Sequence, residues 1–152
     1  MKRALLRVLY VGRNAYWRVF QPITLGVQVI LVREGQVLLV RHSYRPGWFL
    51  PGGGIKRRET VEAAARREVR EETGAEAHEL RLLGVYDSFG ERKSDHIAVF
   101  VSERFDLVGG HDEEIAEVGF FPFEGLPEGV SPGTRARVED YLAGRWGASG
   151  QW

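Results

Sequence analysis

The chain has 152 residues, of which 43% are hydrophobic and 28% charged, an ordinary composition for a single globular domain over residues 1–152. It carries 21 basic and 21 acidic side chains, so net charge gives no reason to expect a nucleic-acid partner. It has no cysteine, which excludes disulfides, thiolate metal sites and a cysteine nucleophile, and which fits a cytoplasmic protein. No apolar run is long enough to predict a membrane span.

Basic side chains are concentrated at the N-terminus, where residues 1–33 contain no acidic one. One interpretation is a surface helix whose apolar side chains cover the core or a partner chain. The other is a basic arm that attracts an anionic substrate or a membrane surface. The first is favoured for residues 1–21, and it makes a homodimer a possible assembly. The basic residues are Lys2, Arg3, Arg7, Arg13, Arg18 and Arg33.

The first predicted elements are strands. Residues 23–32 alternate in polarity and are rich in β-branched side chains. Glu34-Gly35 predicts a tight turn that leads into a hairpin partner at residues 36–43. Trp48–Leu50 is a short predicted strand, and residues 51–54 predict an irregular turn because glycine accepts positive φ at little cost.

The next predicted element is a helix between Thr60 and Gly74. Thr60 is a suitable N-cap, and glycine is a common residue at the C-terminal end of a helix. Between them a narrow apolar stripe repeats with helical spacing, which indicates close packing on a sheet. The stripe consists of Val61, Ala64, Ala65 and Val69.

The rest of the chain mixes strands with one further helix. Strands are predicted over residues 79–89, 96–105 and 115–123, with a glycine-rich acidic loop over 108–114. A last helix is predicted over 134–143, and the tail after it is expected to fray. Because strands and helices do not alternate regularly, the expected fold is α/β with a mixed sheet and helices on its faces.

Seven residues at fixed spacing carry the chemistry. Glu68, Glu71 and Glu72 are three and four residues apart, so they project from one face of the helix beside the glycine turn. Carboxylates at such short distances repel one another unless a cation neutralises them. Mg²⁺ and Mn²⁺ are cations that prefer oxygen ligands. Alternating arginines also suit an ordinary solvated helix, but the glycine turn and the long spacing to Glu59 favour a metal site. The seven residues are Gly53, Glu59, Arg67, Glu68, Glu71, Glu72 and Gly74.

These residues resemble the Nudix box, G-x5-E-x7-R-E-U-x-E-E-x-G-U, in which U is a bulky aliphatic residue. The pattern matches from Gly53 to Gly74, and Ala75 takes the place of the last aliphatic residue. The resemblance implies a Nudix-type α/β/α sandwich with a mixed sheet. It also implies hydrolysis of a nucleoside diphosphate linked to another moiety, with Mg²⁺ or Mn²⁺ to polarise the diphosphate and activate water.

The resemblance also implies roles for individual residues. Glu68, Glu71 and Glu72 would be metal ligands together with the Gly52 carbonyl, while Glu59 and Arg67 would form an ion pair that braces the helix. The backbone of Gly52 and Gly53 would approach the bound ligand closely. The general base in this family is either a glutamate of the box or an acid from a late loop, so both Glu71 and Glu114 are candidates here.

Other assignments stay open. Arg41 is a candidate for gripping a phosphate, since a guanidinium suits that anion, but a structural salt bridge is an equal alternative. The organic part of the small-molecule substrate could be that of a nucleotide sugar, ADP-ribose, a nucleoside triphosphate or a dinucleotide. The competing function is a nucleotide-binding or sensing module on the same scaffold that does not turn over its ligand.

Overall fold

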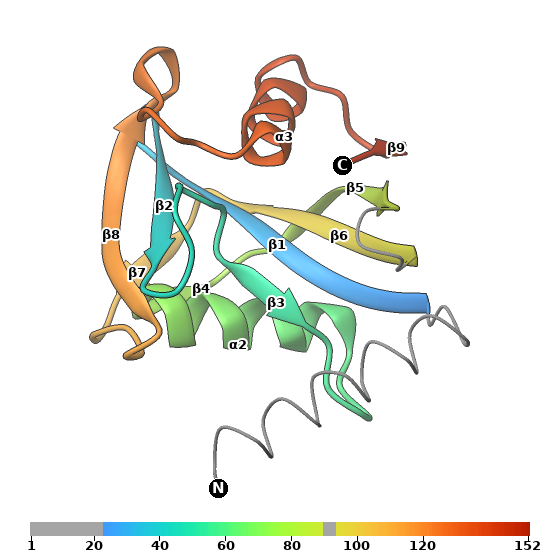
Figure 1. Ribbon diagram of the computed structural model, residues 1–152, viewed down its shortest axis with the longest axis horizontal. Coiled ribbons are helices and arrows are strands. Elements are labelled where there is room, and N and C mark those ends of the chain that lie inside the picture. Colours follow the sequence, from blue (N-terminus) through green and yellow to red (C-terminus); the bar gives the residue numbers. More distant parts are fainter. Residues whose placement is uncertain (1–22, 90–93) are drawn as a thin grey trace, which may run out of the picture.

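The computed structural model describes residues 23–89 and 94–152. They form a seven-stranded mixed sheet with one helix on each face, α2 (Val61–Thr73) and α3 (Pro132–Leu142) (Figure 1). The predicted α/β/α sandwich with a mixed sheet is therefore confirmed. The predicted N-terminal arm lies outside the described residues. No helix within the described ranges is long and apolar enough to cross a membrane.

The central strand is β1 (Ile23–Arg33), and its two halves have different neighbours along one side. β2 (Gln36–His42) runs antiparallel to the second half as the predicted hairpin partner. β3 (Gly52–Gly54) runs antiparallel to the first half. On the other side, β6 (Ser94–Ser102) pairs with β1 in parallel. The parallel pair makes the sheet mixed.

The sheet continues outward in the order β8-β2-β1-β6-β5-β9, and β3 lies beside β1. A separate two-stranded ribbon joins β4 to β7, and a short 3-10 helix, η2, follows β8. The bounds of these elements are β4 (Ala75–Ala77), β5 (Arg81–Ser88), β7 (Phe105–Leu107), β8 (Ile115–Pro122), η2 (Phe123–Gly125) and β9 (Ala148–Gln151).

Alternate strand residues point to opposite faces, which gives the sheet two cores. On the α2 face, Val29 and Leu38 are fully buried in one cluster with Ala65 of the helix. On the α3 face, Ile30 is fully buried in a second cluster that includes Val138 of the helix. Each helix therefore closes one core, and the buried apolar area is the main source of stability.

The caps of α2 agree with the sequence analysis. The Thr60 hydroxyl accepts a hydrogen bond from the Ala63 amide at 3.1 Å. Gly74 ends the helix in the left-handed region at φ 67°, and its amide donates to the Arg70 carbonyl at 3.0 Å. These two ends set the rotational position of every side chain between them, including the three glutamates.

Two predictions about glycine-rich segments are wrong. Residues 52–54 are not an irregular turn but the strand β3, while Trp48 and Phe49 form only isolated bridges. The tail does not fray, because β9 pairs with β5 and the Trp152 amide donates to the Asp87 carbonyl at 2.8 Å. Both strands are held by backbone hydrogen bonds, and glycine contributes no side-chain periodicity that would predict them.

The strand predicted over residues 96–105 is divided in the structure. β6 ends at Ser102, and β7 begins at Phe105 and leaves the sheet to pair with β4. The Ser102 hydroxyl donates to the Arg104 carbonyl at 3.1 Å across this break. Such local side-chain bonds compete with strand pairing and are common at turns.

Gly74 and Gly144 offer a matched pair of substitutions, since both follow a helix at φ 67° and 66° respectively. We expect Gly144→Ala to cost about 1–2 kcal/mol, the usual penalty for a side chain in the left-handed region. Gly74→Ala should cost roughly 1–3 kcal/mol more, because its methyl group would collide with the backbone of Gly109. Urea unfolding of both variants measures the difference. Equal losses would contradict the close packing of Gly74.

Candidate active site

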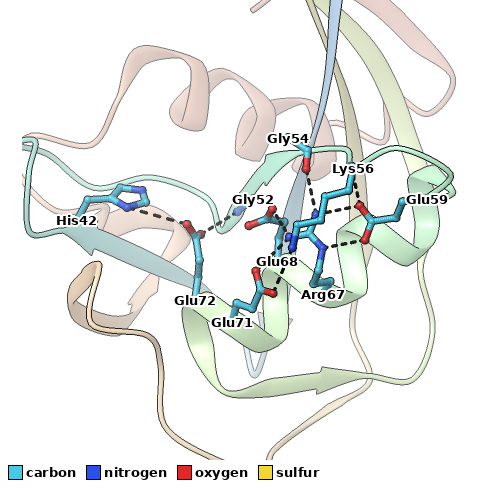
Figure 2. Close-up of polar contacts among 9 residues, drawn as sticks. All are labelled: His42, Gly52, Gly54, Lys56, Glu59, Arg67, Glu68, Glu71 and Glu72. Atoms are coloured by element: carbon cyan, nitrogen blue, oxygen red, sulfur yellow. Dashed lines mark hydrogen bonds and ion pairs between the residues drawn. The ribbon is translucent and has the colours of Figure 1, made fainter. Parts of the chain in front are cut away.

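Arg67 is the centre of the polar contacts on α2 (Figure 2). Its guanidinium binds Glu59 through two bonds, from Nε at 2.7 Å and from Nη2 at 2.9 Å. Its Nη1 lies 2.5 Å from Glu68 and 3.0 Å from Glu71. Nη2 also donates to the Gly54 carbonyl at 3.0 Å. One side chain thus joins three carboxylates of this segment and ties α2 to β3.

The Glu59 side chain lies in the loop that precedes α2 and is held as an anion. Its hydrogen bonds with Arg67 are the largest cause that lowers its pKa from 4.5 to about 2, followed by the bond from the Lys56 amide. In turn, the bond with Glu59 is the main cause that raises the pKa of Arg67. Planar two-bond pairs of this kind are strong and geometrically specific.

Glu72 has a different environment from its neighbours on the helix. Its side chain is 14% exposed, its Oε2 accepts from the Gly52 amide at 2.9 Å, and its Oε1 lies 3.9 Å from Nδ1 of His42. Burial is the largest cause that raises its pKa from 4.5 to about 7, and the negative charges of Glu68 and Glu114 add to it. An ionised Glu72 is therefore a buried anion with little neutralisation.

His42 does not supply the missing charge. Burial first, and then the positive charge of Arg45, lower the pKa of His42 from 6.5 to about 4. The imidazole is therefore neutral at neutral pH, and its contact with Glu72 is not an ion pair. Nη2 of Arg45 lies 2.9 Å from Nε2 of His42.

Gly52 and Gly53, beside the acids, lie where neighbouring atoms come too close to leave room for a side chain. A side chain on Gly53 would place its Cβ 2.6 Å from the carboxylate of Glu68. A side chain on Gly52 would place its Cβ 2.8 Å from Cα of Gln28 on β1. Only glycine lets the carboxylate and two backbone segments pack this closely.

The late acidic loop lies against the end of α2. The Asp112 amide donates to the Glu71 carbonyl at 2.8 Å, and the Ser43 amide donates to the Glu114 carbonyl at 2.8 Å. The charge of Glu114 acts on Glu72, as its effect on the pKa shows. The structure therefore brings Glu114 close to the box glutamates, although it lies far from them in the sequence.

Two arginines at the end of β2 have different surroundings. Arg41, a candidate phosphate contact, binds Glu117 of β8 at 2.6 Å in an exposed salt bridge, the alternative that the sequence left open. Arg45, which the sequence analysis did not single out, lines a cavity of about 350 Å³ and lies over the ring of Phe49 at 3.8 Å. It follows β2 in a loop without periodicity, so only its position in the fold reveals it.

No metal cluster is preformed within residues 23–89 and 94–152, where no three acidic or histidine side chains are arranged to hold an ion. Nη1 of Arg67 lies between Glu68 and Glu71 and supplies the positive charge there. Gly52 presents its amide, not its carbonyl, to Glu72. The predicted ligands are thus neighbours, but two of them are held by a guanidinium.

A family model described as a NUDIX domain matches residues 22–141. The chain belongs to the Nudix hydrolase family. The family resemblance found in the sequence is thereby confirmed. The matched range covers α2, α3 except its last residue, and all the candidate site residues.

Relatives of this Nudix hydrolase include an ADP-ribose pyrophosphatase from Methanocaldococcus jannaschii. The two are 32% identical over 138 residues, which is 86% of this chain and 78% of the relative. A diphosphoinositol polyphosphate phosphohydrolase 3-alpha from Mus musculus is 47% identical over 85 residues, 55% of this chain and 51% of the relative. This chain therefore spans about half the length of the second relative.

Solved structures of similar fold include a MutT NUDIX hydrolase from Burkholderia pseudomallei. It has a TM-score of 0.70 and 27% identity, and the match covers 78% of this chain and 98% of that one. A NUDIX hydrolase from Nitrosomonas europaea has a TM-score of 0.71 and 23% identity, with 83% and 93% covered. At that identity the second likeness concerns the fold alone.

We expect Glu59→Gln to reduce the pH dependence of stability in acid. The pKa of Glu59 is lowered from 4.5 to about 2, so its contribution is present above pH 4.5 and is lost as the pH falls through 2. Urea unfolding from neutral pH into this range measures the slope for both proteins. The control is Glu62→Gln, which removes an exposed pair with Arg66 and should have little effect. Parallel curves for wild type and Glu59→Gln would contradict the ion pair.

Proposed function

We propose that this Nudix hydrolase cleaves a diphosphate bond in a nucleoside diphosphate linked to another moiety, with Mg²⁺ or Mn²⁺ as cofactor. The observation that carries the proposal is the buried carboxylate of Glu72, which forms no salt bridge with an arginine or lysine among the residues that the structure describes. The charges of Glu68 and Glu114 oppose its ionisation, and the charge of Arg45 offsets them only in part, because the pKa of Glu72 stays raised. A buried anion of this kind is costly without a cation. A bound cation would therefore stabilise the ionised form of Glu72, and the glycine backbone beside it leaves room for a ligand.

The donor set fits a hard divalent ion. Glu68, Glu71 and Glu72 offer carboxylate oxygens from adjacent turns of one helix, and the Gly52 carbonyl is a further candidate oxygen. When bound, the ion would neutralise phosphate oxygens and lower the pKa of a coordinated water. Glu68 is already packed against Gly53, whereas Glu71 is the most exposed of the three, at 39%. Glu68 and Glu72 are therefore the expected core of the ion site.

The remaining residues would orient the reactants. Arg67, held by Glu59, would keep the box glutamates in position once the ion takes over their charge. Arg45 lines the cavity and its charge acts on Glu72, so its guanidinium would bind the diphosphate. Glu71 and Glu114 both remain candidates for the base that takes a proton from the attacking water. In-line attack on a diphosphate needs this positioning more than it needs covalent catalysis.

The first substrate to test is ADP-ribose. The relative that matches most of this chain is named an ADP-ribose pyrophosphatase. The other classes are nucleotide sugars, nucleoside triphosphates and dinucleotides. The cavity of about 350 Å³ beside Arg45 is lined by Gly52–Gly54 of β3, so the organic moiety would have room there.

We expect the wild type to hydrolyse at least one of these classes when Mg²⁺ or Mn²⁺ is present and none in the presence of a chelator. Phosphate release, after phosphatase treatment of the products, measures this. Glu72→Gln should lower kcat/KM about a hundredfold or more, since tenfold corresponds to about 1.4 kcal/mol. Glu76→Gln, an exposed acid just beyond the helix, is the matched control and should retain full activity. Binding of nucleotides without any turnover would support the sensing module instead.

We expect Mg²⁺ to stabilise the protein more at pH 8 than at pH 5. The pKa of Glu72 is raised to about 7, so without metal its contribution to stability is present below 4.5 and is lost as the pH rises through 7. An ion that binds the charged carboxylate reverses this loss. Thermal unfolding with and without Mg²⁺ measures the effect in wild type and Glu72→Gln. An equal shift in both proteins would contradict the assignment of Glu72.

A further inference from the structure

Part of the floor of the cavity of about 350 Å³ that Arg45 lines is glycine backbone of β1 and β3. Gly26 of β1 lies opposite Gly54 of β3, and Gln28 lies opposite Gly52. Residues two apart on a strand share a face, so Gly26 and Gln28 of β1 and Gly52 and Gly54 of β3 lie on the same side of the sheet. The Gln28 side chain covers Gly52, since a Cβ on Gly52 would lie 3.0 Å from its Cγ. We call Gly26 and Gly54, the two glycines that remain, the glycine shelf.

The space above the glycine shelf is open at one end. A Cβ built on Gly54 would meet no heavy atom within 4 Å, and its φ is not positive. The wall on the other side of β1 is Ile97 of β6, which lies opposite Gly26 in the parallel register. Thr24, Asp95 and His96 line the cavity as well, so polar groups lie beside this apolar wall. The glycine floor and the Ile97 side chain are suited to a planar ring, and the polar groups to its edge.

Gln28 lies on the same face of β1 as Gly26 of the glycine shelf. It is half-buried and lines the cavity, and its Oε1 is buried without a hydrogen-bond partner in the part of the chain that the structure describes. Buried polar atoms of proteins nearly always have a partner. The terminal torsion of glutamine is soft, so the amide turns toward a ligand at little cost. The missing partner is an N–H or O–H donor that a bound molecule would supply.

We propose that the glycine shelf seats the nucleobase of the substrate and that the amide of Gln28 selects adenine over guanine. The inference rests on the proposed function, because it presumes a nucleotide whose diphosphate lies toward Arg45 and Glu72. A glutamine amide pairs through two hydrogen bonds with the N6 amino group and N7 of adenine. The corresponding edge of guanine offers two acceptors, O6 and N7, and leaves Oε1 without a donor.

Calorimetric titration with ADP and with GDP tests the proposal without requiring turnover. Wild type should bind ADP about tenfold more tightly than GDP or better, the usual worth of one such amide–base pair. Gln28→Met, which keeps the length but removes the amide, should bring the two affinities close together. Equal affinities in wild type, or an unchanged preference in Gln28→Met, would overturn the role of Gln28.

A second variant tests the shelf itself. Gly54→Ala adds a methyl group into open space, so it should fold normally and weaken the binding of both nucleotides. Gly150→Ala, whose methyl group also meets no atom within 4 Å but lies on β9, should bind as wild type does. Unweakened binding to Gly54→Ala would place the base elsewhere. A base preference lost in Gln28→Met, in a protein that hydrolyses no nucleotide with Mg²⁺ or Mn²⁺, would refute only the proposed hydrolysis.

Discussion

The guanidinium of Arg67 is the interaction on which the site depends. It binds Glu59 in the preceding loop, Glu68 and Glu71 on its own helix, and the Gly54 carbonyl on β3. Like charges on adjacent turns of a helix repel, so the acidic face is stable only while a cation lies among its members. Arg67 provides that cation for two of the three helical glutamates and fixes α2 against β3.

Glu72, the third glutamate, is not bound by Arg67. This difference from Glu68 and Glu71 determines which chemistry the site can support. Glu72 turns toward the Gly52 amide and a neutral His42, so burial raises its pKa to about 7. The protein therefore holds one acid in a state that a divalent ion would relieve. On the other face of β3 the same glycine strand forms the floor of the cavity. A three-residue strand thus separates the acids from the space available to the organic part of a substrate.

The sequence predicts those parts of the fold and site in which side-chain types repeat with the spacing of a strand or a helix. The alternation of β1, the caps of α2 at Thr60 and Gly74, and the spacing of the box residues predict the sandwich and the acidic face. β3 was missed because a strand of three glycines leaves no side-chain pattern. β9 was missed because its four residues, ASGQ, are small or polar and show no alternation. Arg45 and Gln28 were missed because their positions depend on strands that pair across the sheet, which local spacing does not reveal.

We expect the acidic face of α2 to seat a divalent ion between Glu68 and Glu72 while Arg67 keeps its bond to Glu59. The decisive experiment is a crystal structure grown with Mn²⁺ and a nucleotide and analysed by anomalous scattering. It should show a manganese peak within coordination distance, about 2.0–2.4 Å, of oxygens from both glutamates. An empty acidic face, or manganese bound only elsewhere on the protein while nucleotide is present, would contradict it.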